Sequence, residues 1–294
     1  METARCRAFM VSAEAGSFTR AAEQLNYTPS GVSQLVTAFE NELGFALLRR
    51  TKRGVSLTES GKLIMPAVRE FLAQEGRIEE IASEINGILV GSVTIAAYSS
   101  MATHWLPAVI RDFQQDYPGV RIRLMEGIWQ EVMGWLDDKT ADIAFVSRQE
   151  PMHHEWITLA EDPMLAILPK DHPLAGEKSY PVKRCEQDSI IMPALGRDAD
   201  VDALFRQYNV TPNIHFTTLE NFAAMAMAEQ GLGVSIMNDL ITEKRICDVV
   251  KLPLDPPSSI TLGIAIPSRS GASPAVKRFM EYAIERLGPD AVSG

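Results

Sequence analysis

Cysteines, long apolar runs and excess positive charge are all scarce in this chain of 294 residues. The three cysteines, Cys6, Cys185 and Cys247, are odd in number and far apart, which argues against a disulfide framework and against a zinc site. No run of about 18 apolar residues occurs, and the N-terminus lacks the apolar segment of a signal peptide, so we expect a cytoplasmic protein without a membrane partner. The formal net charge of −10 excludes a basic surface over the whole chain.

Motifs for catalysis and for cofactor binding are also missing. The sequence contains no GxGxxG, P-loop, HExxH or GxSxG pattern. The adjacent His153 and His154 lie in a polar turn, a spacing that suits a loop better than a metal site. We therefore expect no enzyme activity, no catalytic residues, no cofactor and no metal.

Charge is unevenly distributed along the chain. Residues 1–58 carry seven Lys or Arg against five Asp or Glu, a balance of +2, which leaves −12 for the remainder. Four cations and no acid lie between Leu43 and Thr58. This asymmetry favours a small module that meets polyanions, joined to a larger acidic body.

Two short helices are predicted within residues 16–44. Ser17 is a suitable N-cap for the first, whose apolar residues recur at helical spacing up to Leu25, and the helix ends near Asn26. Thr28 is a suitable N-cap for the second, with Pro29 at its first position and its end at Gly44. Helices joined by about three residues are typical of a helix-turn-helix, whose second helix enters the DNA major groove.

The second helix presents a polar face, and a cationic hairpin follows it. Any solvated helix is polar outside, so the face alone is weak evidence, but "RRTKRGVSLTESG" predicts a two-stranded wing whose cations could meet phosphates or a minor groove. The candidate DNA contacts are Thr28, Ser30, Ser33, Gln34, Thr37, Arg49, Arg50, Lys52 and Arg53.

These motifs resemble a known family. From Phe9 to Gly61 the chain is similar to the N-terminal domain of LysR-type transcriptional regulators, with "GSFTRAAEQL", "SGVSQ", "ELG" and "RRTKRGVSLTESG" in the family's order and spacing. The chain has Pro29 where the family often has Gln, and Gly31 where it often has a small residue such as Ala. The first departure removes a side-chain donor, so a base contact at Pro29 is not carried over.

A long helix is predicted beyond the wing. Apolar residues recur at steps of three to four, with one gap of seven, from Leu63 to Ile88, a stripe that a small winged domain cannot cover alone. The stripe could pack on the chain's own C-terminal body, whereas the resemblance implies a linker helix that pairs two subunits. The candidate dimerisation residues are Phe71, Ile78, Ile81 and Ile85.

From Ser92 onward, strand and helix patterns alternate. This predicts an α/β domain with a parallel sheet. The resemblance implies a periplasmic-binding-protein-like effector domain of two lobes. The expected organisation is a winged helix-turn-helix at 1–58, a linker helix and hinge at 59–91, and an effector domain at 92–294, with lobe I at 92–161 and 267–294 and lobe II at 162–266.

Hydroxyl groups gather where the predicted strands end, and ligands of open α/β sheets bind beyond such ends. Thr217 with Glu220 also fits a capping box, and Ser99 or Ser100 could simply cap a helix. We expect a small anion or neutral polar ligand between the lobes, a small carboxylate being one candidate. The candidate effector contacts are Ser99, Ser100, Met101, Thr103, Ile128, Ser147, Arg197, Thr217 and Thr218.

The favoured function is a homodimeric or homotetrameric DNA-binding regulator whose action depends on a small-molecule effector. Its expected partners are operator DNA, the effector and, as a further candidate, RNA polymerase. A thiol-based redox regulator is an alternative, although Cys185 and Cys247 are unlike the close cysteine pair of the family's peroxide sensors. A solute-binding protein or enzyme with a merely structural N-terminus is the other alternative.

Overall fold

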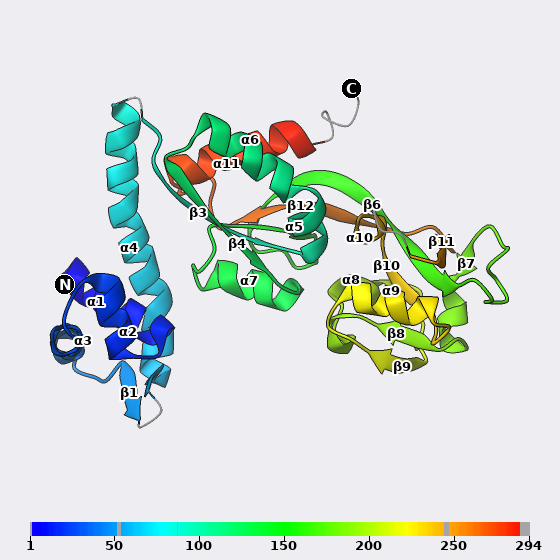
Figure 1. The fold of residues 1–294 in the computed structure, drawn as a ribbon, viewed down its shortest axis with the longest axis horizontal. Coiled ribbons are helices and arrows are strands. Elements are labelled where there is room, and N and C mark those ends of the chain that lie inside the picture. The colour runs from blue at the N-terminus through cyan, green and yellow to red at the C-terminus, as the bar shows by residue number, and fades with distance from the viewer. Residues whose placement is uncertain (1, 52–53, 87, 244–246, 289–294) are drawn as a thin grey trace. The chain divides into compact units, whose positions relative to one another are not determined.

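The computed structural model describes residues 2–51, 54–86, 88–243 and 247–288, and it forms two compact units (Figure 1). The first unit comprises residues 1–91 with 137–140, and the second comprises 92–136 with 141–294. Each unit has its own apolar core. Within the described ranges, no helix combines the length and apolar character needed to cross a bilayer.

Three helices open the first unit: α1 (Thr3–Ala15), α2 (Phe18–Leu25) and α3 (Pro29–Leu43). The predicted caps of α2 and α3 are confirmed, because Ser17 accepts from the amide of Arg20 and Thr28 accepts from that of Gly31. Phe9 of α1 packs on Phe39 of α3, with ring centroids 5.9 Å apart. The helix-turn-helix is therefore held by a core to which α1, absent from the sequence prediction, contributes.

The predicted wing is confirmed as β1 (Leu48–Thr51) paired antiparallel with β2 (Gly54–Leu57). Gly54 has φ of 126°, and a Cβ at this position would meet the carbonyl oxygen of Gly16 at 2.4 Å. Val55 donates its amide to the same oxygen at 2.9 Å. The wing is thereby fixed to the turn between α1 and α2. The candidate contacts Lys52 and Arg53 lie outside the described residues.

The predicted long helix is α4 (Glu59–Ile85), capped by Thr58. Phe71 packs on the core of the winged domain, so this candidate dimerisation residue is already partly covered within one chain. Ile78 is 70% exposed, Ile81 39% and Ile85 81%. Ile78 and Ile85 are therefore largely uncovered by the described residues of a single chain, and Ile81 is partly covered.

The second unit is the predicted two-lobed α/β domain. Its main sheet has the strand order β4-β3-β5-β12-β6-β11-β7, with β10 paired to β6. The strands are β3 (Gly91–Ala97), β4 (Val120–Glu126), β5 (Ile143–Ser147), β6 (Glu155–Pro169), β7 (Tyr180–Pro181), β10 (Ser235–Asn238), β11 (Val249–Asp255) and β12 (Ser259–Ile266), and a second sheet pairs β8 (Ile190–Met192) with β9 (Ile214–Thr217).

Helices cover these strands in both lobes (Figure 1). Lobe I contains α5 (Ser99–His104), α6 (Leu106–Asp116), α7 (Trp129–Asp137) and α11 (Pro274–Leu287), and lobe II contains α8 (Ala199–Gln207), α9 (Asn221–Glu229) and α10 (Asp239–Thr242), with 3₁₀ turns η1 (Val182–Glu186) and η2 (Ala194–Gly196). In lobe I, Phe113 of α6 meets Phe279 of α11 edge to face at 5.1 Å.

The expectation of a parallel sheet is wrong in part. β3 pairs parallel with β5, and β8 pairs parallel with β9, as βαβ connections require. β12, however, pairs antiparallel with both β5 and β6. The reason is that β6 and β12 run in opposite directions along the connection between the lobes.

β6 belongs to both lobes. Its residues 155–163 pair with β12, and its residues 164–169 pair with β10 and β11 (Figure 1). The chain therefore passes between the lobes in a continuous strand. The predicted residue boundaries of the domains and lobes stay a prediction.

One local expectation is also wrong. Thr217 does not cap α9 with Glu220, because Thr217 ends β9 and Thr218 donates its amide to the carbonyl of Met192. Glu220 itself is the N-cap residue of α9, without a side-chain cap bond. The pairing of β9 with β8 thus includes Thr217, which the capping pattern places at the start of the next helix.

Candidate DNA-binding surface and effector cavity

The recognition helix α3 is tied to the wing by Arg50. This residue of β1 donates from Nη1 to Ser33 Oγ at 3.0 Å and from Nη2 to Thr37 Oγ1 at 2.9 Å. Its guanidinium carbon also lies 4.9 Å from the ring centroid of Phe18. Arg50, Ser33 and Thr37 therefore form one connected group, in which the cation orders the hydroxyls of α3.

The other candidate DNA contacts that the structure describes differ in exposure and in hydrogen bonding. Gln34 is exposed on α3, and Arg49 is exposed on β1. The Thr28 hydroxyl accepts from Gly31 at 3.1 Å and lies 3.1 Å from the Ser30 hydroxyl. Thr28 therefore has a structural role as a cap, whereas Gln34 and Arg49 are open to a partner.

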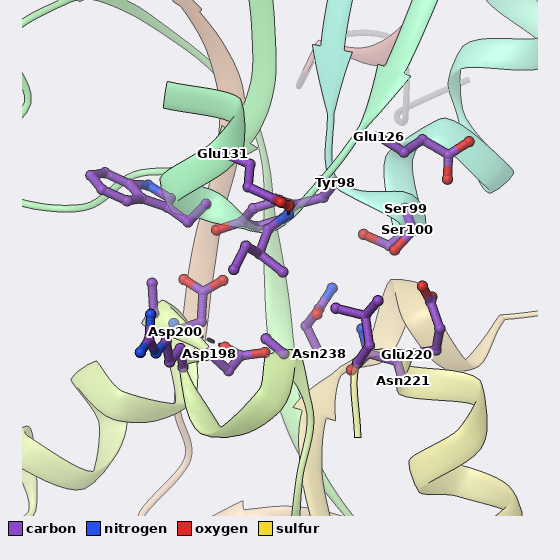
Figure 2. Close-up of a pocket in the computed structure, with 17 residues that line it drawn as sticks. Tyr98, Ser99, Ser100, Glu126, Glu131, Asp198, Asp200, Glu220, Asn221 and Asn238 are labelled. Carbon is purple, nitrogen blue, oxygen red and sulfur yellow. Dashed lines mark hydrogen bonds between the residues drawn. The ribbon is translucent and has the colours of Figure 1, made fainter. Parts of the chain in front are cut away.

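A cavity of about 310 Å³ lies between the two lobes of the second unit. In Figure 2, Tyr98, Ser99, Ser100, Glu126 and Glu131 of lobe I face Asp198, Asp200, Glu220, Asn221 and Asn238 of lobe II. The remaining lining residues are Gly127, Ile128, Trp129, Ala194, Arg197, Ala199 and Leu219. The volume is at the lower end of the range for small-molecule pockets.

Four of the candidate effector contacts predicted from the sequence line this cavity: Ser99, Ser100, Ile128 and Arg197. Ser99 and Ser100 begin α5 directly after β3, at the carboxyl end of that strand. Arg197 follows β8 and the short turn η2. The rule that ligands bind beyond strand ends therefore located the cavity.

Five predicted effector contacts do not line the cavity. Met101 is fully buried in lobe I, and Ser147 is buried with its hydroxyl 3.0 Å from that of Tyr98. Thr103 is exposed on α5, while Thr217 and Thr218 are held by the strand pairing described above. In lobe II, Glu220, Asn221 and Asn238 line the cavity instead.

Five lining residues outside the list of candidate effector contacts are acidic: Glu126, Glu131, Asp198, Asp200 and Glu220. Two of them carried usable signals. Glu126 ends β4, so the strand-end rule applied to this strand would have found it. Asp198 is the N-cap of α8, whose pattern begins at "DADVDALF".

Three of these acids are engaged within the protein. Asp198 Oδ1 accepts from the amides of Asp200 and Val201 at 3.0 and 3.1 Å, which caps α8. Glu131 Oε2 accepts from the amide of Ile128 at 3.1 Å. Gln149 donates to Asp200 Oδ1 at 2.5 Å. Their positions are therefore set by the fold.

Burial changes the protonation of the cavity wall. Asp200 is 8% exposed, and burial together with the charge of Asp198 raises the pKa of its carboxyl to about 7. Burial also raises the pKa of Asp198, and burial with the charge of Asp200 raises that of the Tyr98 phenol. The Asp200 carboxyl therefore changes from protonated to ionised near neutral pH.

Asn238 connects the cavity to the strand shared by the lobes. Its Nδ2 donates to Oδ2 of Asp162, in β6, at 2.5 Å. The same carboxylate accepts from the amide of Leu240 at 3.2 Å. A ligand that contacts Asn238 would therefore act directly on the connection between the lobes.

The cysteines are free and give no support to a thiol switch. Cys6 and Cys185 are buried, and burial raises the pKa of both thiols, that of Cys185 to about 12. A reactive thiol needs the opposite shift. Within the part of the chain that the structure describes, no cluster of His, Cys, Asp or Glu has the arrangement of a metal site.

Known proteins match both units. Residues 4–62 match the family described as bacterial regulatory helix-turn-helix protein, lysR family, and residues 86–288 match the LysR substrate binding domain. The chain is 32% identical to the uncharacterized HTH-type transcriptional regulator YvbU of Bacillus subtilis, over 99% of this chain and 100% of that protein.

Solved structures agree in fold. A full-length OxyR variant from Pseudomonas aeruginosa superposes with a TM-score of 0.78 at 20% identity, covering 98% of this chain and 96% of that one. CbnR, a LysR family regulator solved in complex with its target DNA, superposes with a TM-score of 0.64 at 21% identity, covering 96% and 99%. These matches, and the helix-turn-helix and two-lobed domain in the chain itself, place this protein in the LysR family of transcriptional regulators, which are not enzymes.

Proposed function

We propose that this regulator binds a two-half-site operator as a homodimer, or as a homotetramer built from two such dimers, and that an effector between its lobes changes that binding. The effector cavity carries the proposal, because its walls come from both lobes. A ligand that contacts both walls stabilises one lobe arrangement over another, which is the requirement for allosteric control.

The DNA contact is proposed for the exposed polar end of α3 and for the wing. Gln34 has an amide that can pair bidentately with adenine in the major groove. Arg49 and the sequence-predicted Lys52 and Arg53 supply cations for phosphates or the minor groove. Arg50 orders Ser33 and Thr37 from inside the same surface. CbnR, solved with its target DNA, supports this use of the fold.

The dimer is proposed for the distal part of α4. Ile78, Ile81 and Ile85 are exposed at helical spacing, and two such stripes would bury one another. Dimerisation brings two recognition helices to one duplex, as paired half-sites require. A cytoplasmic location, and contact with RNA polymerase at the promoter, follow as parts of the same proposal.

Selection from a random duplex library tests the DNA-binding half. The full-length chain should enrich a sequence with two related half-sites, and the logarithm of its affinity should fall linearly with that of salt concentration. Arg49→Ala should flatten this slope by about one unit per chain, as loss of one phosphate contact does. Arg121→Ala, a change to an exposed cation of the second unit, is the matched control.

Operator affinity with and without ligand tests the effector half. A ligand found by thermal shift should change the affinity for the enriched duplex, because it favours one lobe arrangement. Absence of any enriched duplex would refute the DNA-binding proposal. A cavity ligand that leaves operator affinity and DNA bending unchanged would refute the regulatory link.

A further inference from the structure

A group of hydrogen-bonded side chains joins the two lobes at the effector cavity. Gln149, which follows β5 of lobe I, donates from Nε2 to Oδ1 of Asp200, in α8 of lobe II, at 2.5 Å. The Ser147 and Tyr98 side chains of lobe I also hydrogen-bond to the Asp200 carboxyl. Tyr98 and Asp200 line the cavity from opposite walls (Figure 2). Together, Tyr98, Ser147, Gln149 and Asp200 form an interlobe cluster.

Lobe I holds its three members of the interlobe cluster independently of lobe II. The Tyr98 hydroxyl lies 3.0 Å from Ser147 Oγ, and Gln149 Nε2 donates to the same oxygen at 3.3 Å. Ser147 itself is fully buried at the end of β5. These bonds lie within one lobe, so they persist when the lobes move apart, whereas the bonds to Asp200 must break. Asp200 is therefore the member of the cluster that depends on the lobe arrangement.

The same arrangement disfavours a charge on Asp200. The residue is 8% exposed, and Asp198, which caps the same helix, places a second carboxyl beside it. Burial and then the charge of Asp198 raise the pKa of Asp200 to about 7, against the opposing effect of its three bonds to lobe I. When lobe I moves away, water reaches the carboxyl and its pKa returns toward the ordinary value of about 4. Asp200 thus binds its proton more tightly while the lobes are in contact.

The other groups around Asp200 leave this difference in place. Burial raises the pKa of the Tyr98 phenol, which therefore stays neutral near pH 7, and Ser147 and Gln149 carry no charge. A neutral Asp200 keeps its bonds, because one oxygen accepts from Gln149 and the protonated oxygen can donate to a hydroxyl. The charged residues elsewhere on the cavity wall are Glu126, Glu131, Arg197 and Glu220.

From these contacts we propose that the interlobe cluster is a latch, closed while Asp200 carries a proton and released when it ionises, so that the lobe arrangement responds to pH. The inference rests on the proposed effector site and names a way in which that site is regulated. The closed form binds more protons than the open form between about pH 4 and pH 7, so a rise in pH through 7 favours release. The ratio of closed to open chains should fall about tenfold between pH 6 and pH 8.

Distances between spin labels on the two lobes test the latch. The labels are attached at Gln115→Cys on α6 and Ala226→Cys on α9, both exposed positions, in a Cys247→Ser background whose other native cysteines are buried. The labelled full-length chain is mixed with an excess of unlabelled chain, so that pairs within one chain dominate, and is measured without DNA at pH 6 and pH 8. We expect one distance population to give way to a second as the pH rises.

Three variants identify the group responsible. Asp200→Asn resembles the protonated acid and should keep the pH 6 distances at pH 8. Gln149→Ala removes a donor of lobe I and should lower the closed-to-open ratio about fivefold at pH 6, as loss of one hydrogen bond does. Asp171→Asn, at an exposed position, should behave as the parent chain.

Each other result overturns the inference. Identical distances at both pH values in the parent chain would mean that Asp200 has only a structural role, even where Tm depends on pH. A pH response that persists in Asp200→Asn would assign it to another group, and an unchanged ratio in Gln149→Ala would mean that the cluster does not hold the lobes. The proposed function fails separately, when no duplex is enriched.

Discussion

Arg50 in the wing donates to the hydroxyl of Ser33 in the recognition helix at 3.0 Å, so one cation connects the two parts of the DNA-binding surface. Its second nitrogen holds Thr37. Arg50 therefore sets the orientation of hydroxyls that could contact bases, besides contributing positive charge.

Replacing Arg50 with Lys should separate these two contributions. Lysine keeps the charge but has no planar fork to reach both hydroxyls. We expect the salt slope of operator binding to persist while discrimination between operator and random duplex falls by about 1 kcal/mol, roughly fivefold. Arg49→Lys on the same strand is the control. Unchanged discrimination in Arg50→Lys would show that the contacts to Ser33 and Thr37 do not order the helix for DNA.

Gln34→Ala should remove base discrimination with little effect on the salt slope. An amide that pairs with adenine contributes about 1–3 kcal/mol at one position of each half-site. Affinities for operator variants substituted one base pair at a time should show the loss at a single position. Gln24→Ala on α2, also exposed, is the control. A uniform loss across all variants would mean that Gln34 contacts the backbone of the duplex.

Aspartate at Ile81 and Ile85 should break the proposed dimer. Each unpaired charge buried at the seam costs roughly 3 kcal/mol or more, so analytical ultracentrifugation should find monomer. Both side chains are exposed in the single chain, so its fold should survive. Ala73→Asp, exposed on another face of α4, should leave the dimer intact. A dimer that persists in the double variant would place the interface elsewhere.

Asp200→Asn should change how stability depends on pH. The folded chain holds this proton to about pH 7, whereas an unfolded aspartate releases it near pH 4, so the folded state binds more protons in between. The free energy of unfolding contributed by this group therefore falls as the pH rises from about 4 to about 7. The groups that face Asp200 are Asp198, Ser147, Tyr98 and Gln149.

The asparagine side chain in this variant cannot ionise, so the variant should gain most stability over the parent chain at high pH. We expect its Tm, relative to the parent chain, to be higher at pH 8 than at pH 5, by roughly 2–4 °C for each kcal/mol of charge burial removed. Asp171→Asn, at an exposed position, is the control. Equal differences at both pH values would mean that Asp200 does not titrate between pH 5 and pH 8.

Local signals account for what the sequence predicted well. Caps and turns act within a few residues, so Ser17, Thr28 and Gly44 determined the bounds of α2 and α3. Ser99 and Ser100 were found because the end of a strand is also a local feature. Asp198 carries a comparable local signal, because it is the N-cap of α8.

Contacts between distant segments account for what was missed. Arg50 and Ser33 are 17 residues apart, and their pairing requires the wing to fold back on α3. The acidity of the cavity depends on residues of both lobes, such as Glu126 and Glu220, which line one cavity only when both lobes are assembled. The parallel sheet was wrong for the same reason, since the direction of β12 is set by its pairing with β6.

The strand β6 also limits how this regulator can respond. Because it pairs with β12 in one lobe and with β10 and β11 in the other, relative motion of the lobes must bend a hydrogen-bonded ladder. Such a ladder has elastic stiffness, so part of a ligand's contact energy is stored as strain in the strands. Affinity and regulatory strength are then separate quantities: a compound that fits the cavity without bending β6 would bind tightly and change operator occupancy little.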